Sequence, residues 1–93
     1  MSEFEVAALL LSGVGEKTRH FLDAARGRID WPALLHEAVS WSSSERLLVH
    51  AARDLWAGDD PVSLRQLVDR LDAQNWQLLL RALALARGQE SLP

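Results

Sequence analysis

Side chains that commonly perform chemistry are sparse in this 93-residue sequence, which contains three histidines and no cysteine. The lack of cysteine excludes thiolate catalysis, disulfides and cysteine metal ligands. His20, His36 and His50 each fall on the polar side of an expected helix, and none has a second histidine three or four residues away. Zinc-binding helices carry such a pair one turn apart. We therefore expect surface histidines, no metal site and no cofactor.

The sequence also lacks a grouping of nucleophile, base and orienting acid that would predict covalent catalysis. The serine run Ser42–Ser44 precedes an expected helix and is typical of a cap. Residues 13–18 resemble the end of a phosphate-binding loop, because Lys17 and Thr18 follow two glycines. That motif needs glycine directly before lysine, whereas Glu16 stands there. We expect a turn at this place and no enzymatic activity.

Acidic pairs and tryptophans are the remaining candidates for ligand binding. The pairs Asp59/Asp60 and Asp69/Asp72 lack the alternating spacing of a calcium loop, and we interpret them as structural. Four tryptophans could line a pocket for a cationic ligand, although tryptophan at helical spacing more often packs at a core. We expect core or core-edge positions for Trp31, Trp41, Trp56 and Trp76.

The charge and hydropathy patterns argue against two kinds of partner. The formal net charge of −3 gives no basic footprint for nucleic acid or an anionic membrane surface. The apolar run Val6–Leu11 is far shorter than the ~20 residues of a membrane span, and residues 1–5 are acidic where a signal peptide is basic. We expect a cytoplasmic protein, and the excess of arginine over lysine indicates a bacterial source.

The pattern of apolar residues predicts helices throughout. Leucine and alanine, both strong helix formers, make up a third of the chain, and no segment alternates apolar and polar residues over a strand's length. Caps and glycines separate expected helices at about 3–11, 16–26, 31–40, 45–57, 64–71 and 73–87. We predict an all-α, compact single domain over residues 1–93, with five to six short helices, orthogonal or bundle-like, and a frayed tail at 89–93.

Two of the expected helices are apolar over more than one face. Apolar side chains cover roughly 200° of the helix at 45–57 and roughly 260° of the helix at 73–87. A helix that packs on one side needs an apolar stripe of only about 100°. We therefore predict that helix 45–57 is central, and that the last helix has apolar surface left over for a partner.

The leftover surface of the last helix leads to our first functional hypothesis. Surplus apolar surface marks an association site, and a two-fold homodimer is the commonest such association. The expected interface residues are Trp76, Leu79, Leu80, Leu83 and Ala84. We expect a non-enzymatic interaction module that binds protein, as a homodimer, and does not bind a membrane.

Residues 63–87 support an alternative hypothesis, because they resemble the helix-turn-helix of winged-helix regulators. The resemblance implies a DNA-binding regulator that reads bases from the start of its second helix, through Gln74, Asn75, Gln77 and Arg81. The sequence departs from the pattern at Asp72, where glycine is common, and no wing sequence follows Gly88. Basic side chains supply most of the affinity for DNA, and none occurs in the second helix before Arg81.

Overall fold

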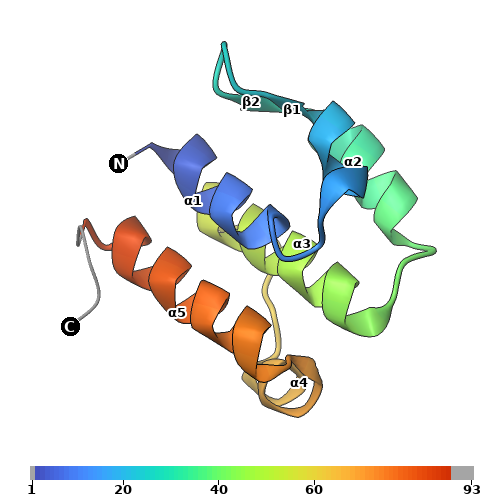
Figure 1. The fold of residues 1–93 in the computed structure, drawn as a ribbon, viewed down its shortest axis with the longest axis vertical. Helices are drawn as coiled ribbons and strands as arrows, with labels where there is room; N and C mark the ends of the chain where they lie inside the picture. Colours follow the sequence, from blue (N-terminus) through green and yellow to red (C-terminus); the bar gives the residue numbers. More distant parts are fainter. Residues whose placement is uncertain (1, 89–93) are drawn as a thin grey trace.

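The computed structural model describes residues 2–88 and shows, within that range, five α-helices, one 3-10 helix and one small antiparallel sheet (Figure 1). The elements in chain order are α1 (Glu3–Leu11), η1 (Glu16–Phe21), β1 (Leu22–Asp23), β2 (Arg28–Ile29), α2 (Trp31–Ala38), α3 (Ser43–Ala57), α4 (Leu64–Arg70) and α5 (Ala73–Ala86). The predicted all-α class is confirmed. The expected frayed tail at 89–93 lies outside the described residues.

Every α-helix starts after a short polar residue, as the sequence pattern requires. In each case the side-chain oxygen accepts a hydrogen bond from the backbone N–H three residues later, which satisfies a donor that the helix itself leaves free. The capping residues are Ser2, Asp30, Ser42, Ser63 and Asp72. At the start of α3 the capping is reciprocal, because the Glu45 carboxylate accepts from the Ser42 N–H at 3.1 Å.

The core forms around α3, which contacts α1, α2, α4 and α5. Helix α1 packs on both α3 and α5, and it is apolar on nearly all sides for that reason. The largest fully buried side chains are Leu10, Leu11, Leu34, Leu48 and Val49. The predicted central position of helix 45–57 is therefore correct. The radius of gyration, 12.3 Å, is that expected of a compact chain of this length.

Three of the four tryptophans are half-buried at the edge of this core, and Trp31 is buried within it. The Trp31 and Trp56 rings meet edge to face, with centroids 5.7 Å apart. The Trp31 Nε1 atom is buried and has no hydrogen-bond partner among the described residues. The tryptophans therefore contribute to packing, as predicted.

The helix predicted at 16–26 is wrong. The segment forms the 3-10 helix η1 and then a hairpin, in which Leu22 pairs with Ile29 and Asp23 with Arg28. Thr18 and Phe21, three residues apart, are the two buried residues of η1, a spacing that places them on one side of a 3-10 helix. The hairpin extends from the body of the molecule at the end opposite α4 (Figure 1).

Lys17 of η1 forms an ion pair with Glu45 at the start of α3. Lys17 Nζ donates to Glu45 Oε1 at 2.9 Å and lies 4.8 Å from the centroid of the Trp41 ring. The Lys17 hydrogen bond is the main reason why the pKa of Glu45 lies below its ordinary value of 4.5. The Glu45 carboxylate therefore takes part in the cap of α3 and also connects α3 to η1.

The helices found between residues 2 and 88 are too short, or too polar, to cross a lipid bilayer.

Candidate functional site

An apolar groove lies between α3, α4 and α5 and is the most distinctive surface feature of the described residues. Its volume is about 190 Å³. The groove is lined by Ala51, Asp54 and Leu55 from α3, Val62, Leu64 and Leu67 from the α4 region, and Trp76, Leu79, Leu80 and Leu83 from α5. We call these ten residues the apolar groove. Ligand pockets for drug-sized molecules usually measure about 300–1,000 Å³, so this groove suits a few side chains better.

Large apolar side chains on both walls of the groove are open to solvent. Leu64 on α4 is 78% exposed, while Leu80 and Leu83 on α5 are 36% and 42% exposed. Val68, one turn after Leu64, is 56% exposed. Among residues 2–88, the only other exposed side chain of this kind is Val39, after α2. The exposed apolar surface is therefore concentrated at the groove.

Asp54 is the one ionisable residue that lines the apolar groove. Its side chain is half-buried, and within residues 2–88 its carboxylate makes neither a hydrogen bond nor an ion pair. By contrast, Asp23, Asp59, Asp60 and Asp69 each pair with a basic side chain. The groove thus combines apolar walls with one negative charge that the described part of the chain leaves unpaired.

The interface residues expected from the sequence fall into three groups. Leu80 and Leu83 are exposed, and Trp76 is half-buried in the groove. Leu79 and Ala84 are buried, with 5% and 7% of their surface exposed. Leu79 belongs to the core and also lines the groove. The structure therefore brings Trp76, Leu80 and Leu83 together at a surface and leaves Leu79 at its base.

The residues of the DNA-binding alternative do not form one face. Gln74, Gln77 and Arg81 are exposed on α5. Asn75 instead faces the turn after α1, since a Cβ built on Gly13 would lie only 2.7 Å from Asn75 Oδ1. Asn75 is half-buried there and points away from the face that carries Gln74, Gln77 and Arg81. The DNA-binding hypothesis stays a prediction, carried by three residues of which one is basic.

A second, more polar pocket of about 400 Å³ lies on the other side of α3. It is lined by Trp31, Pro32, Leu35, Arg53, Asp59 and Asp60. Arg53 donates to both Asp59 oxygens, from Nε at 2.9 Å and from Nη2 at 2.7 Å. Its guanidinium carbon also lies 5.4 Å from the centroid of the Trp31 ring. The charged groups of this pocket therefore bind one another.

These contacts hold the segment between α3 and α4 in place. His50 lies one turn before Arg53 on α3, and its Nδ1 atom is 2.5 Å from Asp60 Oδ2. The Arg53 hydrogen bond holds the pKa of Asp59 below its ordinary value of 3.8, and the same bond raises the pKa of Arg53. Sequence reasoning assigned His50 to the solvated surface and missed this pairing, although the structural role predicted for Asp59 and Asp60 agrees with the contacts.

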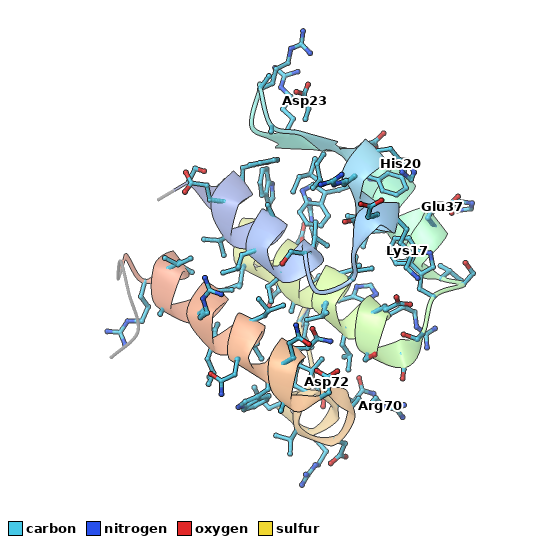
Figure 2. The ribbon with its side chains drawn as sticks, viewed as in Figure 1. Lys17, His20, Asp23, Glu37, Arg70 and Asp72 are labelled. Atoms are coloured by element: carbon cyan, nitrogen blue, oxygen red, sulfur yellow. The ribbon has the colours of Figure 1, made fainter. Side chains whose placement is uncertain are left out.

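Six other charged or titratable side chains lie far apart along the molecule. Figure 2 shows Asp23 on the hairpin and Arg70 and Asp72 at the opposite end, with Lys17, His20 and Glu37 between them. No group of three His, Asp or Glu side chains within residues 2–88 could hold a metal ion.

No protein-family model, curated protein or solved structure matches this chain. The candidate site is therefore defined by its own geometry.

Sequence reasoning missed six of the ten groove residues as site residues, among them Asp54 and Leu64. On its own helix each is an ordinary position: Asp54 belongs to the polar strip of α3, and Leu64 to the apolar stripe of a short helix. Only the packing of α4 beside α3 and α5 brings them to one groove.

Proposed function

We propose that this chain is a non-enzymatic protein-interaction module that self-associates through α5 and the apolar groove. The observation that supports the proposal is the exposure of Leu80 and Leu83 on α5 beside Leu64 on α4. Exposed apolar patches rimmed by polar residues mark association surfaces on soluble proteins. Because α5 lies along one edge of the groove, a two-fold axis near Leu80 and Leu83 brings the same surface of two copies together.

Sedimentation equilibrium with one disruptive variant tests this function. We expect a dimer for the wild-type chain at tens of micromolar, and a monomer for Leu83→Glu, since a carboxylate would be buried at the two-fold contact. Val39→Glu is the matched control, because Val39 is 71% exposed and does not line the groove. This variant should sediment as the wild type does. A monomeric wild-type chain, or a Leu83→Glu chain that remains dimeric, contradicts the proposal.

A further inference from the structure

We propose that α5 of a second copy enters the apolar groove and that its Arg87 pairs with Asp54 there. The inference rests on the proposed function and adds the element that enters the groove and the charge pair that orients it. Two copies of the pair form in each dimer, because an isologous contact repeats every interaction about its axis. Asp54 and Arg87 would thereby determine the specificity of one copy for another.

The first step is the face that α5 presents. Trp76, Leu80, Leu83 and Arg87 are spaced by four, three and four residues, which places them on one side of a helix. Leu80, Leu83 and Arg87 are exposed. The outer face of α5 is therefore a row of apolar side chains that ends in a cation. A partner helix that lays apolar anchors at this spacing into an apolar groove is a recurring mode of recognition.

The second step is charge complementarity. Neither the Asp54 carboxylate nor the Arg87 guanidinium takes part in an ion pair within residues 2–88. Closing the groove over Asp54 removes water from a charge, which is unfavourable unless a cation compensates it. Arginine suits that position, because its apolar stem can lie along leucine side chains while the guanidinium reaches the carboxylate. The unmatched charges on the two sides of the contact are thus opposite in sign.

The third step compares α5 with the other exposed apolar side chains of the described residues. Apart from Leu64 and Val68 on the α4 side of the groove, the exposed large apolar residues between 2 and 88 are Leu80 and Leu83 on α5 and the solitary Val39. A single valine cannot fill a groove lined by ten residues. The outer face of α5 is therefore the part of a second copy that matches the groove.

Charge reversal with mixing tests the pair. We expect Asp54→Arg and Arg87→Asp, each alone, to raise the dimer dissociation constant about tenfold or more, because each homodimer then holds two like-charged pairs. An equimolar mixture of the two variants should recover the wild-type dissociation constant, since both pairs in the mixed dimer are again opposite in charge. The double variant Asp54→Arg/Arg87→Asp should recover it as well.

Arg81→Asp is the matched control, because it makes the same charge change on α5 about 120° around the helix from Arg87. It should leave dimerisation close to wild type. If Leu83→Glu abolishes the dimer while the single charge variants associate normally, the Asp54–Arg87 pair is wrong and the proposed function stands. A mixture as weak as its components also overturns the pair. A wild-type chain that is monomeric overturns both the Asp54–Arg87 pair and the proposed function.

Discussion

Gly13, in the turn after α1, packs against side chains of α3 and α5. A Cβ at this position would lie 2.7 Å from Asn75 Oδ1, 2.9 Å from Leu78 Cδ1 and 3.0 Å from Leu48 Cδ1. These distances are shorter than ordinary van der Waals contact. Glycine therefore allows the turn after α1 to pack directly against side chains of two other helices.

Gly13→Ala should destabilise the fold, because the three neighbouring side chains must shift to admit a methyl group. We expect a loss of about 1–3 kcal/mol in the free energy of unfolding, measured by urea denaturation. A variant within about 0.5 kcal/mol of wild type would show that Asn75 and the leucines can turn aside.

The Lys17–Glu45 contact makes stability depend on pH. The hydrogen bond from Lys17 lowers the pKa of Glu45 in the folded chain below its ordinary value of 4.5. A group with a depressed folded pKa contributes stability above its unfolded pKa and loses it as pH falls through the folded one. Asp59, whose pKa Arg53 lowers from 3.8, acts in the same direction at slightly lower pH.

We therefore expect the free energy of unfolding to fall as the pH drops below about 4.5. Glu45→Gln should make that decline shallower, since the glutamine amide does not titrate. Urea denaturation between about pH 3 and pH 7 measures the slope. An unchanged slope in Glu45→Gln would assign the acid sensitivity to other carboxylates.

At the scale of elements, α4 carries residues with opposite roles three positions apart. Leu67 is the buried residue of this helix, with 5% of its surface exposed, whereas Leu64 is 78% exposed on the groove wall. Packing thus depends on Leu67, while Leu64 contributes little to the core.

We expect Leu67→Ala to lower the free energy of unfolding by about 2–5 kcal/mol. Leu64→Ala should change the stability of the folded monomer by less than about 0.5 kcal/mol and weaken self-association instead. Denaturation at low protein concentration and sedimentation at higher concentration separate the two effects. Equal losses of stability in both variants would contradict the assignment of Leu64 to an interface.

The helices were predictable where a local signal marks the boundary. Ser2, Asp30, Ser63 and Asp72 start their helices as the sequence suggests, and Gly58, at φ 70°, ends α3. The segment 16–26 was not predictable in the same way. Gly27 has φ 63°, a conformation that suits both the end of a helix and a tight turn. The hairpin there depends on pairing with Arg28 and Ile29, which a helical pattern does not reveal.

At the scale of the whole molecule, the wide apolar arc of α5 was predicted correctly, but its division between core and surface was not. The packing of α5 buries Leu79 and leaves Leu80 and Leu83 exposed, although the three are equally apolar. Which side of a helix its neighbours cover is a property of the tertiary structure. For the same reason, the Asp54 carboxylate, which makes no ion pair within residues 2–88, and the exposed Leu64 could be assigned to the groove only after α4 was placed.

The short length of α4 has a consequence for motion. This helix has seven residues, packs mainly on α3 and buries one side chain. A segment with so few buried contacts opens at a lower free energy than the rest of the fold. We expect the backbone amides of α4 to exchange with deuterium faster than those of α3, and to slow as the protein concentration rises. Equal rates in the two helices, or rates independent of concentration, would contradict this.

Because α4 forms one wall of the groove, any occupant of the groove would bind the state in which α4 is folded. Binding would shift the local unfolding equilibrium of α4 toward that folded state, so recognition and the ordering of α4 are thermodynamically linked.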